Sequence, residues 1–224
     1  LNQKMVPEEV RAKNYQPKTG EFTHPGYVKA LEYLKSINDK GYFNEGVNTT
    51  SNALANELFY GGRAAIVYMS QPYYKIALEE YMPGKWASFP MPAISEGEGN
   101  QNVITGAPEL FFVSAKTKYP DEAIEFLRFL TNMENSEKLV KELGYASCVI
   151  KANNENTTIK QVVEILDYVA RAEGMAEWLD TAVEARIVDK YLANVQLEIG
   201  GSKSAEEAMK EIQEMAKLVR EEMQ

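Results

Sequence analysis

The sequence predicts a helix-rich α/β fold. Most of the chain places apolar residues three and four positions apart, as on one face of an amphipathic helix, and about eight helices are expected. Two short apolar runs, Ala64–Met69 and Leu110–Ser114, lie between turn-forming residues, which is typical of buried strands. Helices dominate, but these two runs favour an α/β fold over an all-α fold.

Local signals define the helix ends. Pro25 suits the first turn of a helix over Pro25–Lys40, and Gly41 suits the position just past its end. Ser204-x-x-Glu207 is a capping box that begins the last helix. Pro120 begins another helix, with two acidic residues in its first turn. The remaining predicted helices are Thr50–Tyr60 (capped by Thr50 or Ser51), Pro72–Tyr81, Ser136–Leu143, Thr157–Glu173 and Thr181–Ile199, and Trp86–Met91 is predicted to be a short strand.

Composition excludes several classes of function. The formal net charge of the 224 residues is −9, and no run of Lys or Arg compensates for it, which argues against a nucleic-acid partner. A single cysteine, Cys148, and a single histidine, His24, disfavour a disulfide, a metal site or a Ser-His-Asp triad. We expect Cys148 to be buried and inert. No cofactor-binding motif is present, so we predict no cofactor and no metal.

The most site-like stretch is the polar-aromatic turn Ser70–Tyr74, directly after the first apolar run. Tyr73 and Tyr74 flank Gln71 together with Tyr68. A sugar ring has apolar C–H faces and a rim of hydroxyls, which stacking aromatic rings and a side-chain amide can match. The alternative is that these tyrosines only pack the following helix, and composition does not decide between the two.

Six segments resemble one protein family. The first, FYGGRAAI over Phe59–Ile66, resembles the F-x-x-G-K-A-A-M signature of bacterial extracellular solute-binding proteins, the sugar-binding subunits of ABC importers related to maltose-binding protein. The others occur in the family's order, and together they cover nearly the whole chain. They are Phe22–Gly41, Phe89–Pro92, Gly106–Ser114, Lys118–Leu127 and Gly200–Ala208.

The resemblance implies a periplasmic-binding-protein-like fold of type II, in which two α/β lobes clamp a ligand. It implies that this chain is the C-terminal portion, a helix-rich C-terminal lobe with a segment that returns to the N-terminal lobe, whose core is missing. On this basis residues 1–95 carry the signature strand of the C-terminal lobe. Residues 96–147 form the hinge crossing and the returning segment, and residues 148–224 supply further C-terminal-lobe helices.

The resemblance also implies a function. A non-enzymatic protein would capture a sugar or oligosaccharide between its lobes and deliver it to the transmembrane subunits of an ABC permease. It would be extracellular or periplasmic, held at the membrane as a lipoprotein through the missing N-terminus. The family often has a stacking tryptophan where Pro72 stands here, so Tyr73 or Tyr74 would replace it. The ligand-binding residues expected are Gln71, Tyr73, Tyr74, Gly106, Glu109 and Trp178.

Three alternatives remain open at this stage. Glu109 and Asp180 could be the carboxylate pair of a carbohydrate-active hydrolase, which would need a short separation between the two carboxyl groups. The protein could also bind a solute other than a sugar. Finally, the chain could be a helical interaction module whose aromatic residues form its core.

Overall fold

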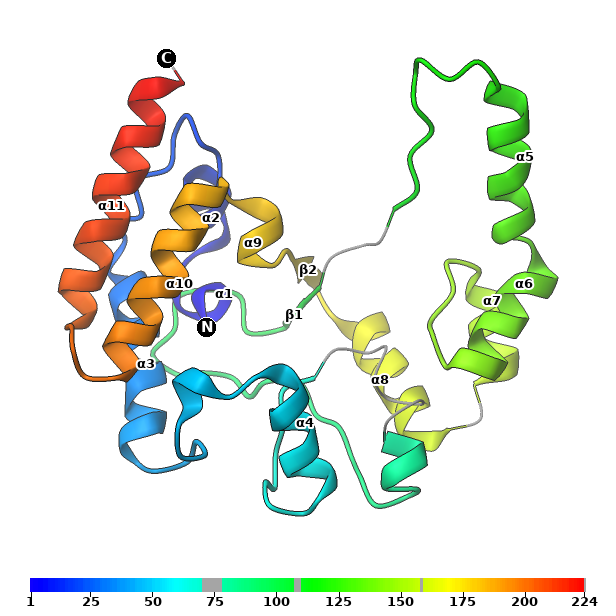
Figure 1. Ribbon diagram of the computed structural model, residues 1–224, viewed down its shortest axis with the longest axis horizontal. Coiled ribbons are helices and arrows are strands. Elements are labelled where there is room, and N and C mark those ends of the chain that lie inside the picture. The colour runs from blue at the N-terminus through cyan, green and yellow to red at the C-terminus, as the bar shows by residue number, and fades with distance from the viewer. Residues whose placement is uncertain (70–77, 107–109, 158, 224) are drawn as a thin grey trace. The chain divides into compact units, whose positions relative to one another are not determined.

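A computed structural model of the chain describes residues 1–69, 78–106, 110–157 and 159–223. The chain divides into two compact units, and each unit is built from separate segments of the sequence, which Figure 1 colours by residue number. The two units have other boundaries than the three segments predicted from the sequence, and the assignment of those segments to lobes stays a prediction. Unit 1 consists of Leu1–Thr50, Met91–Ala107 and Ala172–Gln224, and unit 2 of Ser51–Pro90 and Pro108–Arg171.

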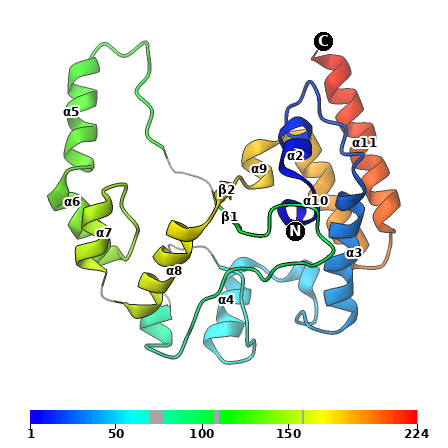
Figure 2. The ribbon, with the colours of Figure 1, turned by 180° about the vertical axis from the view of Figure 1, so that it is seen from behind.

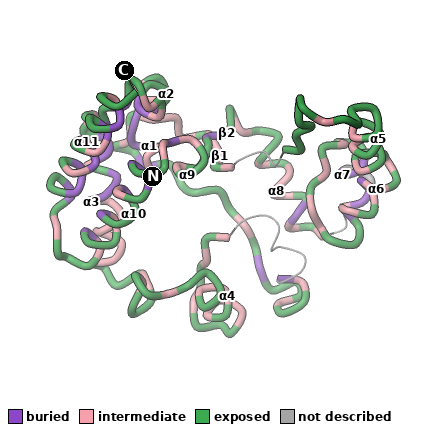
Figure 3. The backbone as a smooth tube through the Cα atoms, turned by 45° about the horizontal axis from the view of Figure 1, so that its top comes forward, coloured by how far each residue is buried: buried purple, intermediate pink, exposed green. Residues whose placement is uncertain are grey.

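Three long helices that pack against one another form the body of unit 1 (Figures 1 and 2). They are α3 (Pro25–Asp39), α10 (Ala185–Ile199) and α11 (Ala205–Glu222). Buried positions recur along these helices, as the purple segments of Figure 3 show. The shorter helices of unit 1 are α1 (Asn2–Met5), α2 (Glu8–Asn14), the 3-10 helix η1 (Val47–Thr49) and α9 (Leu179–Ala182).

The core of unit 1 contains Phe22 and Tyr27, whose side chains are fully buried. Phe22 has a positive φ of 55°, which is uncommon for a residue other than glycine. The Asn14 side-chain oxygen accepts hydrogen bonds from the backbone N–H groups of Glu21 and Phe22, and its amide nitrogen donates to the Tyr27 hydroxyl. One buried amide therefore holds the chain in this turn and satisfies the buried phenol as well.

The sheet of unit 1 has two short parallel strands, β1 (Val103–Thr105) and β2 (Gly174–Ala176). Val103 pairs with Gly174 and Thr105 with Ala176. Neither strand is predicted from the sequence, because each is only three residues long and the paired residues are 71 positions apart.

Unit 2 contains α4 (Asn52–Tyr60) and α8 (Lys160–Arg171), which contribute to one small apolar cluster around Leu78, Trp86 and Val162. Trp86 is held there by a hydrogen bond from its indole N–H to Glu79. A second group of helices in the same unit makes contacts among its own members. It comprises α5 (Pro120–Leu130), α6 (Met133–Lys138), the π-helical turn η3 (Leu139–Leu143) and α7 (Ile150–Asn156).

Three strand predictions are wrong for the structure described. Ala64–Met69, the predicted signature strand, and Leu110–Ser114 are not strands, and Ile66 and Phe112 are 70% and 85% exposed. An apolar run becomes a buried strand only beside a partner strand, and in the described residues the ladder joins β1 and β2 alone. Trp86–Met91 is not a strand either, since Trp86 packs in the apolar cluster instead.

The helix predictions are closer to the structure. His24 caps α3, Ser51 caps α4, and the capping box of α11 is present with both of its hydrogen bonds. The predicted helix Thr181–Ile199 is divided, because the Glu184 carboxylate accepts from two backbone N–H groups and begins α10 anew. Cys148 is exposed, which corrects the buried position expected for it. Most of the predicted helix Pro72–Tyr81 lies outside the described residues.

Glu198, in the last turn of α10, carries a buried carboxyl group. Its side chain is 1% exposed, and its Oε2 atom has no hydrogen-bond partner in the part of the chain that the structure describes. Burial raises the pKa of Glu198 to about 7; the Lys35 ammonium opposes this shift, whereas Asp39 and Glu32 add to it. The carboxyl group also lies at the negative end of the helix dipole, which disfavours its charged form.

This raised pKa makes stability depend on pH. The unfolded chain releases the Glu198 proton near pH 4.5 and the folded chain near pH 7, so stability should fall as pH rises through this window. Between pH 4.5 and 8 we expect the free energy of unfolding of the wild type to fall by an amount on the order of 2–3 kcal/mol. Glu198→Gln cannot ionise at this position and should not show this fall. Thermal unfolding across this pH range measures the difference, with Glu214→Gln on the exposed surface of α11 as the control. Equal pH dependence in the wild type and Glu198→Gln would contradict the assignment.

Candidate functional site

The carboxyl ends of β1 and β2 form the best candidate site in unit 1. Parallel strands end at the same edge of a sheet, and open α/β sheets bind ligands outside this edge. Gly106 follows β1 directly, and its N–H donates to the carbonyl of Ala176. Trp178 lies two residues after β2. We call the set Thr105, Gly106, Met175, Glu177 and Trp178 the strand-end site.

Exposed apolar side chains characterise the strand-end site. Trp178 is 41% exposed and Met175 is 52% exposed. A Cβ atom at Gly106 would lie 3.0 Å from the Met175 sulfur, so the absence of a side chain there gives the thioether its room. An exposed indole and an exposed polarisable thioether are both groups that suit the apolar face of a ring-shaped ligand.

A single side chain, Gln3 of α1, connects the ends of the two strands. Its Nε2 atom donates to the carbonyl of Glu177 at 3.2 Å, and its Oε1 atom accepts from the Thr105 hydroxyl at 2.8 Å. The first bond fixes the residue immediately before Trp178, and the second fixes the residue immediately before Gly106. Sequence reasoning missed Gln3 because the two partners come from segments far apart in the chain.

Helix α1 is itself fixed by the loop that precedes β1. Gln101 donates from Nε2 to the carbonyls of Lys4 and Gly99, both at 2.8 Å, and accepts from the backbone N–H of Ile94 at 2.9 Å. The Lys4 ammonium donates to the carbonyl of Gln101 at 2.7 Å. Gly97 packs so closely on α1 that an added Cβ would collide with the Lys4 carbonyl. We call these contacts the α1 clamp.

Of the six residues expected to bind ligand, the structure describes Gly106 and Trp178, which follow β1 and β2; their role in binding stays a prediction. Gln71, Tyr73, Tyr74 and Glu109 lie outside the described residues, and their roles stay predictions.

The carboxylate pair of the hydrolase alternative is likewise untested. Asp180 is exposed in the first turn of α9, and its partner in that hypothesis, Glu109, lies outside the described residues. In the part of the chain that the structure describes, no three His, Cys, Asp or Glu side chains gather as a metal site would require. No helix among the described residues is both long and apolar enough to cross a bilayer.

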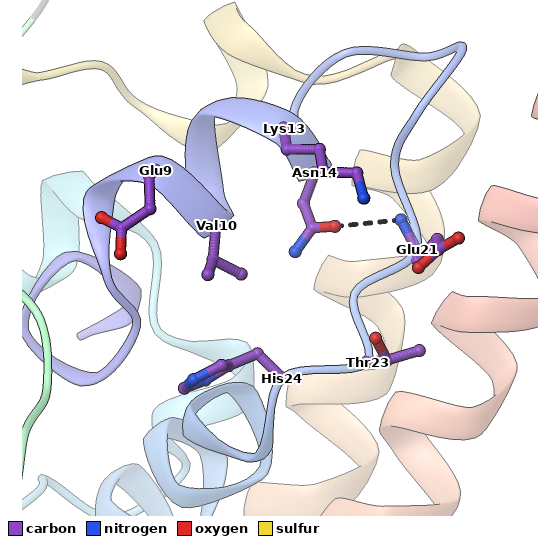
Figure 4. Close-up of a pocket in the computed structure, with 7 residues that line it drawn as sticks. All are labelled: Glu9, Val10, Lys13, Asn14, Glu21, Thr23 and His24. Atoms are coloured by element: carbon purple, nitrogen blue, oxygen red, sulfur yellow. Dashed lines mark hydrogen bonds between the residues drawn. The ribbon is translucent and has the colours of Figure 1, made fainter.

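A separate pocket of about 320 Å³ lies beside α2 (Figure 4). Its polar groups already serve the fold. Asn14 holds the backbone of Glu21, as the dashed line in Figure 4 shows, and the Nδ1 atom of His24 accepts from the N–H of Gly26. Lys13 and Glu9 complete a wall of mixed charge. Because Asn14 and His24 already serve the fold, the strand-end site is the stronger candidate.

Comparisons with known proteins match the chain to one protein family and to two solved structures. The family model described as bacterial extracellular solute-binding protein matches residues 4–137. A solved structure named chitin oligosaccharide binding protein superimposes with a TM-score of 0.79 at 18% identity, covering 100% of this chain and 56% of that chain. No curated protein matches the chain in sequence.

A second solved structure comes from a study of xylan utilization by the thermophilic bacterium Caldanaerobius polysaccharolyticus. Its TM-score is 0.76 at 17% identity, and the match covers 96% of this chain and 55% of that chain. The periplasmic-binding-protein-like fold predicted from the sequence is confirmed by these two likenesses. The chain spans little more than half the length of either structure.

The α1 clamp should contribute strongly to the stability of unit 1. We expect Gln101→Ala to lower the free energy of unfolding by about 2–3 kcal/mol, because it removes three hydrogen bonds to backbone groups at once. Urea denaturation followed by circular dichroism measures the loss. Gln16→Ala, at an exposed glutamine of the same unit, is the matched control. A loss no larger than that of the control would mean that the clamp is not a stabilising feature.

Proposed function

Since this chain belongs to the family of bacterial extracellular solute-binding proteins, we propose that it binds a sugar or oligosaccharide for import into the cell. The strand-end site supplies the observation that carries this proposal: an exposed tryptophan follows one of two paired parallel strands, and a glycine follows the other. Two structurally similar proteins, described by chitin oligosaccharide binding and xylan utilization, support a carbohydrate as the ligand.

The proposed binding mode follows from the chemistry of the site. The indole of Trp178 stacks on the apolar face of a sugar ring, and Met175 adds contact at the edge of that ring. Hydroxyl groups of the sugar are bound by backbone groups near Gly106, where the missing side chain allows close approach. Gln71, Tyr73, Tyr74 and Glu109 stay proposed ligand-binding residues.

The proposed role in transport is that of the substrate-binding component of an ABC importer. Two lobes close on the ligand, and the closed form delivers it to the permease subunits. The protein acts without turnover, outside the cytoplasm, and a lipid anchor would hold it near the permease. The C-terminal lobe is proposed to contain residues 1–95 and 148–224. The hinge crossing and the segment that returns to the N-terminal lobe are proposed to be residues 96–147.

Replacing Trp178 tests the proposed binding mode. We expect Trp178→Ala to weaken binding of chitooligosaccharides or xylooligosaccharides by about tenfold, because stacking on the ring is lost. Calorimetric titration to millimolar sugar measures the affinity. Tyr42→Ala removes another exposed aromatic ring of unit 1, 75% exposed, and should leave the affinity unchanged.

Three results would count against the proposal. If the wild-type chain binds neither sugar series, a non-sugar solute or a structural role becomes the better explanation. Chromatography of the sugars after prolonged incubation tests the hydrolase alternative, and shorter products would reject a function limited to binding. Equal losses of affinity in Trp178→Ala and Tyr42→Ala would place the ligand elsewhere in the chain.

A further inference from the structure

We propose that Gln3 is a positioning residue of the strand-end site, whose side-chain amide sets the spacing between the turn after β1 and the tryptophan after β2. The inference that this spacing matters for sugar binding rests on the proposed function. The positioning itself follows from the geometry and can be tested without a ligand.

The two ends of the Gln3 amide have different partners. The Nε2 atom is the donor to the Glu177 carbonyl, and the Oε1 atom is the acceptor for the Thr105 hydroxyl. A carboxylate in this place would lack the donor, and an alanine would lack both groups. Glutamine therefore matches one strand end through its donor and the other through its acceptor.

The backbone that carries Gln3 is held from several sides. In the α1 clamp the carbonyl of Lys4 accepts from Gln101, and the same carbonyl also accepts from the N–H of Gly99. Asn2, on the other side of Gln3, accepts a hydrogen bond from the Tyr191 hydroxyl of α10 at 3.0 Å. Gly99 packs against the Gln3 carbonyl so closely that an added Cβ would collide with it. With its main chain fixed, the Gln3 side chain can fix the groups that it contacts.

The backbone of Trp178 is held on both sides: its own carbonyl accepts from the N–H groups of Thr181 and Ala182, and Gln3 binds the residue before it. Trp178 is the N-cap residue of α9, a helix of four residues, and its side chain makes no capping hydrogen bond. The Glu177 carbonyl, held by Gln3, immediately precedes it. Because the ring is 41% exposed, core packing alone does not determine its position. The hydrogen bond from Gln3 thus constrains the backbone from which the Trp178 side chain extends.

Fluorine NMR of the protein labelled with 5-fluorotryptophan reports on this position. The chain has two tryptophans, Trp86 and Trp178, so two resonances are expected, and Trp178→Phe assigns them. We expect Gln3→Ala to shift or broaden the Trp178 resonance and to leave the Trp86 resonance, which belongs to unit 2, in place.

Gln213→Ala is the matched control. Gln213 also donates its side-chain amide to a backbone carbonyl of unit 1, that of Phe22 at 3.1 Å, but it does not contact the strand-end site. It should leave both resonances unchanged. A Trp178 resonance that stays at its wild-type position in folded Gln3→Ala would overturn the proposal.

A second variant covers the possibility that Gln3→Ala does not fold. Thr105→Val keeps the shape of the side chain and removes only the hydroxyl that Gln3 accepts from. We expect a smaller shift of the Trp178 resonance in the same direction, and no additional shift when Thr105→Val is combined with Gln3→Ala. Additive shifts would mean that the two residues act independently, which also contradicts the proposal.

The same samples separate this inference from the proposed function. Titration with chitooligosaccharides should move the Trp178 resonance, and Gln3→Ala should weaken the apparent affinity by about three- to tenfold. If no sugar moves either resonance, the proposed function fails, and the effect of Gln3→Ala in the free protein still decides the positioning role. If sugar binds equally to the wild type and Gln3→Ala, the role of Gln3 in binding is rejected.

Discussion

The geometry of unit 1 around its sheet depends on one side-chain amide, that of Gln101. It satisfies the N–H of Ile94 and the carbonyls of Lys4 and Gly99, and so holds a short N-terminal helix against the loop that leads into β1. A four-residue helix such as α1 has no stability of its own, because helix formation has a costly nucleus. The amide therefore makes α1 a fixed element on which Gln3 can act.

The sheet edge illustrates how a small amount of regular structure can organise a site. β1 and β2 are three residues long, and their parallel pairing brings residues near positions 105 and 177 together. Gln3 adds a third segment to the same edge. Three parts of the chain thus meet where Trp178 is exposed.

Sequence reasoning succeeded where the determining interactions are local. The capping box of Ser204 and Glu207, the Ser51 cap and the proline at the start of α3 each act within one turn of helix. The resemblance to a solute-binding family rested on several such segments in order. Gly106 and Trp178 were expected to bind ligand, and that role stays a prediction; nothing in the sequence indicated that they would follow two paired strands.

The failures were non-local. Ile66 and Phe112 belong to runs with the composition of buried strands, yet both are exposed, because composition does not supply the partner strand that would cover them. Gln3 and Gln101 went unnoticed because an isolated glutamine gives no pattern, and their partners come from distant parts of the sequence. A single sequence shows the side chains that could bond but not which backbone groups are placed to receive them.

The turn at Phe22 has a consequence for evolutionary covariation. Asn14 supports the left-handed backbone of Phe22 and at the same time hydrogen-bonds Tyr27. A change at position 14 would leave position 22 without the acceptor that compensates its strained φ. Homologues that lose the asparagine should therefore tend to carry glycine at position 22. At position 27 they should either supply another hydrogen-bond partner for the phenol or have a residue without a hydroxyl group. Three positions of ordinary composition would then change as a group over evolutionary time.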